Sequence, residues 1–263
     1  MKRVVAITQQ ELAGLFLSPL AWVLLVASLL VNGFFFFLYI TQLGGNVTVA
    51  LDLLLGGGWP FWAFLVFLPP LLTMRMISEE ARSGTLEYLL TAPVSDAAVV
   101  AGKFIAATIF MALLWSSVLV YALAIQFAGV TPDWGNVLGG YMGAVLCSGL
   151  FIAIGLLASS MTKTPLLAAF LAFIADLLWM VLPMLAEMVM KQLRSLLAGV
   201  AGGLEAAQDR ISGALDAMNV LSHFQKSFLH GVVDTAEIVF FLTWTLFFLF
   251  LTVRRLEAQR WRG

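Results

Sequence analysis

The stretch that decides the fold runs from Phe104 to Ala128 and reads FIAATIFMALLWSSVLVYALAIQFA. None of its 25 residues is Asp, Glu, Lys or Arg. As an α-helix the stretch would extend about 37 Å, which is enough to cross the roughly 30 Å hydrocarbon core of a bilayer. Polar and apolar residues do not alternate with a period of two, as they would in a membrane barrel strand. The stretch therefore predicts a transmembrane helix.

Five more apolar runs of similar length occur along the chain. The six runs are Leu20–Ile40, Leu53–Met74, Phe104–Ala128, Val137–Ala158, Leu166–Ala186 and Ala236–Val253. Inside a bilayer no water is available, so each run must satisfy its backbone hydrogen bonds internally, as a helix does. The sequence predicts an all-α membrane protein, one domain over residues 1–263 with six transmembrane helices.

The composition excludes two other classes of protein. Hydrophobic residues make up 62% of the chain and charged residues 11%, whereas soluble domains have roughly 25% charged residues. So few charges cannot cover the surface of a water-soluble protein. The net charge of −1 leaves no large basic surface, so nucleic acid is not an expected partner.

The distribution of Lys and Arg predicts the orientation in the membrane. Ten of these residues lie in the four segments on the side of the termini: Lys2, Arg3, Arg75, Arg82, Lys103, Lys163, Arg254, Arg255, Arg260 and Arg262. The other four lie in the connection between spans five and six: Lys191, Arg194, Arg210 and Lys226. Because cytoplasmic segments are enriched in Lys and Arg, both termini are predicted to be cytoplasmic.

The segment Met1–Pro19 precedes the first span and is predicted to form an amphipathic helix on the inner leaflet. Apolar residues recur in it at helical spacing, among charged residues that would stay in water. These apolar residues are Val4, Val5, Ile7, Leu12, Leu15 and Phe16. Pro19 would allow the chain to turn into the membrane. A simple positively charged anchor is the alternative.

The cytoplasmic connection Thr73–Lys103 is longer than a helical hairpin requires and holds seven of the 29 charges. Gly84 and Pro93 are expected to bound a short amphipathic helix at Thr85–Thr91, and Ser95 to cap the third span. The apolar side of the short helix consists of Leu86, Leu89 and Leu90. Such a helix is suited to insertion into a groove on a partner, whereas a solvated loop is the alternative.

The outer connection Met188–Thr235 has 48 residues with mixed charge. Its apolar periodicity predicts two or more short helices that pack on the outer face of the bundle. It contains both histidines, His223 and His230, which are too few without a nearby carboxylate to predict a zinc site. Within the spans, Asp176 is the one carboxylate at depth, where it would line a water-filled path or pair with a polar neighbour.

No catalytic site is predicted in this chain. The residues before Lys103 lack the leading glycine, and those after it the trailing Ser or Thr, of a phosphate-binding loop. One intramembrane carboxylate does not make a hydrolase. We therefore expect no cofactor and no metal in this chain, and an energy source that lies in another polypeptide.

The order of several short motifs resembles that of ABC-2 transporter permeases, of the type V exporter-like fold. The resemblance is closest to the branch of the gliding-motility-associated permease and the copper-site-maturation permease of nitrous oxide reductase. The motifs are Phe16-x-Ser18-Pro19, Leu72-Thr73-Met74-Arg75, Glu79-Glu80, Gly84-Thr85-Leu86-Glu87, Leu90-Thr91-x-Pro93, Gly102-Lys103, Leu221-Ser222-His223-Phe224, Gly231-Val232-Val233-Asp234 and Leu256-Glu257-x-x-Arg260-Trp261. They cover almost the whole chain.

The resemblance implies a six-helix subunit of a bacterial inner membrane that pairs with a second copy or a related permease. It also implies two copies of a separate ATPase, which would bind the ATP and Mg. Residues Gly84–Pro93 would then form the coupling helix in the ATPase groove. The residues carried over to this site are Glu79, Glu80, Arg82, Gly84, Thr85, Leu86, Glu87, Leu89, Leu90 and Pro93.

On this interpretation, ATP binding would push the coupling helices, and the spans would move as rigid bodies. Pro69 and Pro70 provide a place for bending in span two, and Gly139 and Gly143 permit close approach of a neighbouring helix. Two alternatives stay open. One is a membrane anchor that works on an outer-side partner protein without transport, and the other is a stand-alone secondary transporter, which would carry more polar groups at mid-membrane.

Overall fold

The computed structural model describes residues 2–84, 95–197, 213 and 218–260. Every regular element in this part of the chain is a helix. Six helical stretches are long and apolar enough to cross a membrane: Pro19–Gln42, Val47–Ser83, Asp96–Phe127, Trp134–Met161, Pro165–Gln192 and Thr235–Gln259. The prediction of an all-α membrane protein with six spans is confirmed.

The helices follow one another with short turns in most places. In chain order they are α1 (Lys2–Leu17), α2 (Pro19–Gln42), α3 (Val47–Asp52), the π-helical turn η1 (Leu53–Gly57), α4 (Trp59–Thr73), α5 (Ser78–Ser83), α7 (Asp96–Phe127), α8 (Trp134–Met161), α9 (Pro165–Leu197), α11 (Val220–Ser227), the 3₁₀ turn η2 (Phe228–His230) and α12 (Thr235–Arg260). Each predicted span has its counterpart. The largest differences are that α7 begins at Asp96 instead of Phe104 and that α9 continues to Leu197.

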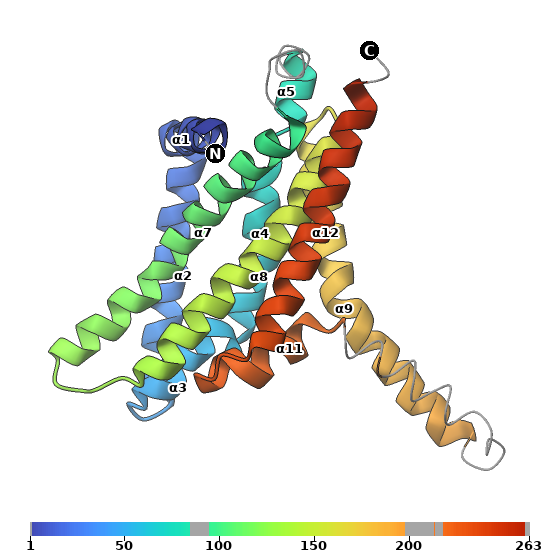
Figure 1. Ribbon diagram of the computed structural model, residues 1–263. Coiled ribbons are helices and arrows are strands. Elements are labelled where there is room, and N and C mark those ends of the chain that lie inside the picture. Colours follow the sequence, from blue (N-terminus) through green and yellow to red (C-terminus); the bar gives the residue numbers. More distant parts are fainter. Residues whose placement is uncertain (1, 85–94, 198–212, 214–217, 261–263) are drawn as a thin grey trace.

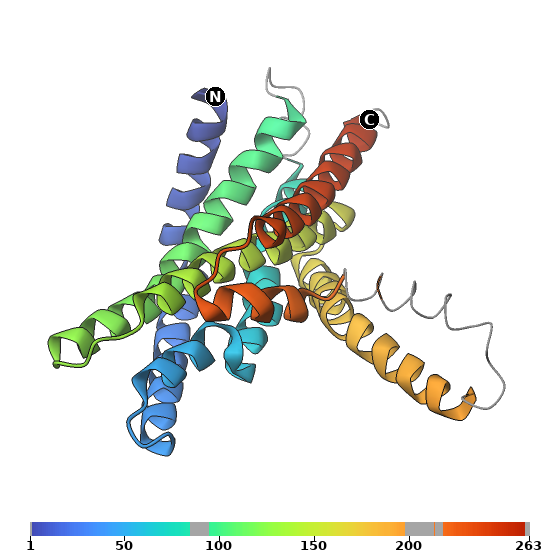
Figure 2. The same cartoon turned by 60° about the horizontal axis from the view of Figure 1, so that its bottom comes forward.

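Helix α8 lies at the centre of the bundle, where it contacts α4, α7, α9 and α12 (Figures 1 and 2). In its most apolar stretch 78% of the residues are buried, against 17% in α9 and in α12. The α8 sequence is rich in Gly, Ala and Ser, which allow neighbouring helices to approach closely. The small residues of span four therefore account for its central position.

Both termini lie at one end of the bundle together with α5, at the top of Figure 1. We call this the α5 end. Helices α3 and α11 lie at the opposite end, which we call the α11 end. Helix α1 lies across the α5 end of α2, and Pro19 occupies the first turn of α2 after the break at Ser18. Two termini at one end agree with an even number of crossings.

Span two departs from a regular helix at both ends of α4. At the α11 end, Gly56 adopts a φ of 128° within η1, a backbone conformation that favours glycine. At the α5 end, a turn at residues 74–77 separates α4 from α5. Between them α4 continues through Pro69 and Pro70, where we expected the bending. The irregular backbone of this span thus lies next to its two ends.

The α11 end is closed by the side chains of Phe224 and Phe228, both fully buried. Phe228 packs on Gly143 of α8, and the backbone of η2 approaches Gly139. A Cβ at Gly143 would lie 2.6 Å from the Phe228 ring. The two glycines of span four therefore permit a close approach, as expected, but to the α11–η2 segment and not to a neighbouring span.

The outer connection differs from its prediction in one respect. We expected separate short helices from Met188 onward, packed on the bundle. Instead α9 continues without interruption from Pro165 to Leu197, and Met188 and Val189 are 62% and 61% exposed as it leaves the bundle (Figure 1). Helix α11 does pack on the bundle. Residues 198–212 and 214–217 of this connection lie outside the described residues.

Candidate functional site

Helix α5 leads into the predicted coupling helix at Gly84–Pro93 and carries the three charged residues Glu79, Glu80 and Arg82. It ends at Gly84, whose φ of 75° lies in the left-handed region that favours glycine. Helix α7 begins after Ser95, whose side chain accepts a hydrogen bond from the N–H of Ala98. Both boundaries are as predicted. Several candidate coupling residues lie outside the described residues: Thr85, Leu86, Glu87, Leu89, Leu90 and Pro93.

The turn between α4 and α5 is held by a serine of α8. The Ser159 hydroxyl accepts hydrogen bonds from the N–H groups of Ile77 and Ser78, at 3.2 and 3.1 Å, and donates one to the Met74 carbonyl at 3.2 Å. These backbone groups have no helical partner of their own, because the helix is interrupted here. Ser159 therefore attaches the start of α5 to the central helix.

We expect Ser159→Ala to destabilise the protein by about 2–3 kcal/mol, because two buried N–H groups lose their acceptor. The matched control is Ser160→Ala. Its hydroxyl is also buried but donates only to the Leu157 carbonyl of its own helix. Thermal unfolding of the purified protein in detergent would measure both variants. Equal shifts for the two variants would contradict the role assigned to Ser159.

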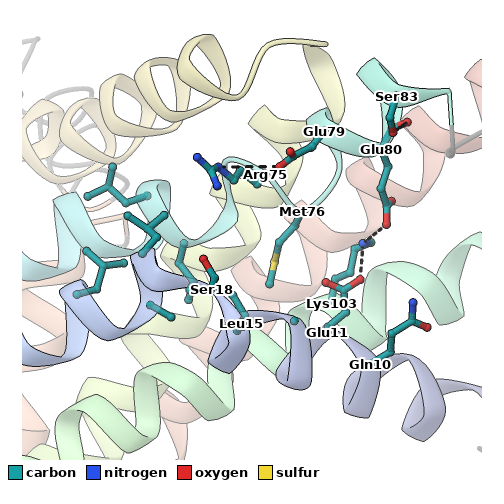
Figure 3. A pocket seen from close by; sticks show the side chains of 16 residues that line it. Gln10, Glu11, Leu15, Ser18, Arg75, Met76, Glu79, Glu80, Ser83 and Lys103 are labelled. Atoms are coloured by element: carbon teal, nitrogen blue, oxygen red, sulfur yellow. Dashed lines mark hydrogen bonds and ion pairs between the residues drawn. The ribbon is translucent and has the colours of Figure 1, made fainter.

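Lys103 in α7 is the centre of a buried ion cluster, shown in Figure 3. Its side chain is only 2% exposed, and Nζ lies 2.6 Å from Glu11 Oε1 in α1 and 2.7 Å from Glu80 Oε1 in α5. An ammonium group withdrawn from water requires such partners, because an unpaired buried charge is costly. Lys103 therefore links α1, α5 and α7 through one side chain.

The residue before Lys103 makes this link sterically feasible. A Cβ at Gly102 would lie 2.6 Å from Ile7 Cγ2, so only glycine allows α1 to pack this closely on α7. The Thr8 hydroxyl donates a hydrogen bond to the Gly102 carbonyl at 3.3 Å. The Gly102-Lys103 pair thus provides both the space for α1 and the charge that holds Glu11.

The sequence alone does not predict that Lys103 and Glu11 meet. The amphipathic pattern of Met1–Pro19 assigned Glu11 to the wet face of α1, and Lys103 counted as a charge of the cytoplasmic connection. In the structure the two side chains face each other beneath α5 (Figure 3). The available signal was weak: a glycine and a lysine at the start of a long apolar helix, with acidic residues in two neighbouring segments.

The other charged residues of α5 and its preceding turn are more exposed. Arg75 and Glu79 lie 3.9 Å apart, with side chains 57% and 47% exposed, and such a surface pair contributes little to stability. Arg82 lies exposed in the last turn of α5. Of the three charged residues of α5, Glu80 therefore contacts the body of the protein, while the side chains of Glu79 and Arg82 are exposed.

A pocket of about 500 Å³ opens beside this ion cluster, between α1, α2 and the α4–α5 turn (Figure 3). Its apolar part comes from the start of α2 and the end of α4, including Leu24 and Leu72. Its polar part comes from Arg75, Glu79 and the Lys103 cluster. The pocket is therefore amphipathic, with its charged groups at the α5 end.

Asp176 does not line this pocket. It is fully buried in α9, and neither of its carboxyl oxygens has a hydrogen-bond partner among the described residues. The indole N–H of Trp179, one turn further along α9, is also without a partner there, while its ring packs on Trp244 and Phe248 of α12. The expectation that Asp176 lies buried at depth holds. Its role in a path or in helix pairing stays a prediction.

At the α11 end His223 pairs with a carboxylate that the sequence did not connect with it. Nδ1 of His223 lies 2.6 Å from Glu237 Oε2, and the imidazole stacks on Phe240. His230 lies in η2, on a different element. Among the described residues no group of three or more His, Cys, Asp and Glu side chains is placed to hold a metal ion.

Comparison with known proteins gave one finding. The family model of the ABC-2 family transporter proteins matches residues 42–261, which is most of the chain. A search of the curated proteins found no match. The matched range includes all the elements from the end of α2 to the end of α12.

Proposed function

The chain belongs to the ABC-2 transporter family and is a membrane permease, and we propose that it couples ATP hydrolysis by a separate ATPase subunit to movement of its spans. In this proposal the ATPase binds ATP and Mg, and the permease contributes no catalytic residue. Helix α5, together with the residues up to Pro93, receives the force. The resulting movement of the spans either exports a substrate or does conformational work across the membrane.

The observation that carries the proposal is the double attachment of α5. Glu80 ties it to Lys103 of α7, which in turn holds Glu11 of α1, and Ser159 of α8 ties its first turn to the centre of the bundle. A displacement of α5 would therefore reach α1, α7 and α8 together, because ion pairs and hydrogen bonds at these distances resist separation. A solvated loop would not need such attachments.

We infer different roles for the three charged residues of α5. Arg82 is exposed at the tip and would contact the ATPase surface. Glu80 would transmit the displacement inward through Lys103. Glu79 lies at the mouth of the pocket beside them. The apolar residues Leu86, Leu89 and Leu90 would occupy the ATPase groove.

The orientation and the wider assembly are part of the same proposal. The excess of Lys and Arg on the side of the termini supports a cytoplasmic α5 end in a bacterial inner membrane. The partners would be a second copy of this chain or a related permease, two ATPase subunits and the surrounding lipids. Within the family, the motifs quoted above favour the branch of the gliding-motility and nitrous oxide reductase permeases.

Deletion of residues 84–91, or the single change Glu87→Lys, should abolish the ATPase activity that depends on the permease, while insertion into the membrane is retained. The reason is that the contact with the ATPase is lost but the spans are untouched. The measurement is ATP hydrolysis by the permease and ATPase subunits reconstituted together in liposomes. Arg254→Lys, an exposed change at the same end of the bundle, is the control. Unchanged coupled hydrolysis in the deletion variant would refute the site.

A second candidate function rests on the projecting end of α9. A helix that continues beyond the bundle with Met188 and Val189 exposed resembles a surface for an outer-side partner protein. The permease would then transmit motion to that partner without transport. ATPase activity that still depends on residues 84–91, but without any solute or lipid leaving the liposomes, would favour this function over export.

A further inference from the structure

The pocket beside the Lys103 cluster combines two chemically different parts. Its floor is apolar and continues along the first turns of α2 and the last turn of α4. These floor residues are Leu20, Ala21, Leu24, Leu71 and Leu72. They belong to helical stretches long and apolar enough to cross a membrane, so we expect the floor to adjoin the hydrocarbon region. A ligand that fills the pocket must therefore present a hydrocarbon chain at this side.

The mouth of the pocket lies at the level of a membrane surface. Trp22, 55% exposed in the first turns of α2, donates its indole N–H to the Phe16 carbonyl at 2.7 Å. Exposed tryptophans concentrate where the lipid headgroups meet the hydrocarbon. Leu17, at the end of α1, is 84% exposed and needs an apolar environment at the same level. The charged residues at the mouth are therefore placed where headgroups lie.

The charges of the lining select among headgroups. Three carboxylates and two cations line the pocket, which gives an excess of one negative charge. Lys103 is held by Glu11 and Glu80, so Arg75 and Glu79 are the charges left at the mouth, in a loose pair 3.9 Å apart. Arginine binds phosphate well, and a carboxylate accepts hydrogen bonds from a primary ammonium. An anionic headgroup without an ammonium would leave the Glu79 carboxylate facing a second negative charge.

We propose that this pocket binds one zwitterionic phospholipid with a primary ammonium, of the phosphatidylethanolamine class. The phosphate contacts Arg75, the ammonium contacts Glu79, and one acyl chain lies along Leu20, Leu24 and Leu72. The volume of about 500 Å³ is in the range of pockets that hold small organic ligands. The bound lipid packs between α1 and the α4–α5 turn, and so stabilises the position of α5. This inference does not depend on coupling to an ATPase.

Gly14 provides the variant that tests the proposal. It lines the pocket from α1, and a Cβ there meets nothing within 4 Å, so a side chain can begin there without a clash. Gly14→Phe should fill the pocket and exclude the acyl chain. Ala13→Phe, on the exposed side of the same helix and outside the pocket lining, is the matched control. Both variants add the same side chain to α1.

The full chain would be purified in detergent and titrated with dioleoyl phosphatidylethanolamine, phosphatidylcholine or phosphatidylglycerol, with bound lipid counted by native mass spectrometry. We expect one retained phosphatidylethanolamine in the wild type and in Ala13→Phe, and its loss in Gly14→Phe. Glu79→Gln should weaken phosphatidylethanolamine binding about tenfold, because one charge-assisted contact is lost. It should leave phosphatidylcholine, which has no ammonium N–H, unaffected.

Three outcomes would overturn the proposal. The first is retention of the lipid by Gly14→Phe. The second is equal binding of phosphatidylcholine, and the third is stronger binding of phosphatidylglycerol. If Glu79→Gln has no effect on phosphatidylethanolamine binding, the headgroup assignment is wrong. Because Glu79 is an exposed surface residue, binding by this variant can be interpreted even if Gly14→Phe has a folding defect.

Discussion

Replacement of Lys103 by methionine should lower the stability of the permease by about 3 kcal/mol, which corresponds to a fall of roughly 6–12 °C in the thermal midpoint. Methionine fills a similar volume but removes the ammonium that lies between Glu11 and Glu80. Both carboxylates are mostly buried, at 21% and 29% exposure of the side chain, so water replaces the lost ammonium only in part. Thermal unfolding in detergent would measure the change.

The controls for this prediction separate charge from packing. The triple variant Lys103→Met with Glu11→Gln and Glu80→Gln should recover most of the lost stability, because no uncompensated charge is left. Arg254→Met, which breaks the exposed pair with Glu257, should cost less than about 1 kcal/mol. If the triple variant is as unstable as the single one, Lys103 acts through its packing and not through its ion pairs.

The Lys103 cluster illustrates which features of the structure can be predicted from the sequence and which cannot. The six spans could be predicted because the membrane requires long uncharged helices, and this requirement is visible residue by residue. The ends of α5 and α7 could be predicted because Gly84 and Ser95 are local signals. The partners of Lys103 could not, because Glu11 lies 92 positions away along the chain and charge pairing leaves no periodic pattern.

Side chains that hydrogen-bond to the backbone of another helix also could not be predicted from the sequence. Ser159 looks like one more small residue of α8, and nothing in its neighbourhood indicates that it holds the turn at Ile77 and Ser78. The close approach at Gly139 and Gly143 was expected, but hydropathy alone cannot distinguish a neighbouring span from the η2 segment. Both features depend on tertiary packing, which cannot be inferred from the hydropathy pattern of one sequence.

The second large effect is expected at the opposite end of the molecule. Gly56→Ala should destabilise the protein by about 3–5 kcal/mol, for two reasons that add. The backbone φ of 128° is unfavourable for any residue with a Cβ. In addition, the new Cβ would lie 2.0 Å from Cε1 of Phe224, so that this fully buried ring must move. Thermal unfolding in detergent would again measure the change.

Two further variants separate these causes. Gly129→Ala has a comparable positive φ, 92°, but a Cβ there meets nothing within 4 Å, so it should show the backbone strain alone, about 1–2 kcal/mol. The double variant Gly56→Ala with Phe224→Leu should cost less than the sum of its single changes, because the smaller side chain leaves room for the new Cβ. Additive losses of stability would mean that Phe224 does not pack against Gly56 at the irregular turn in span two. In that case α11 closes this end of the bundle through its contacts with α8, α9 and α12.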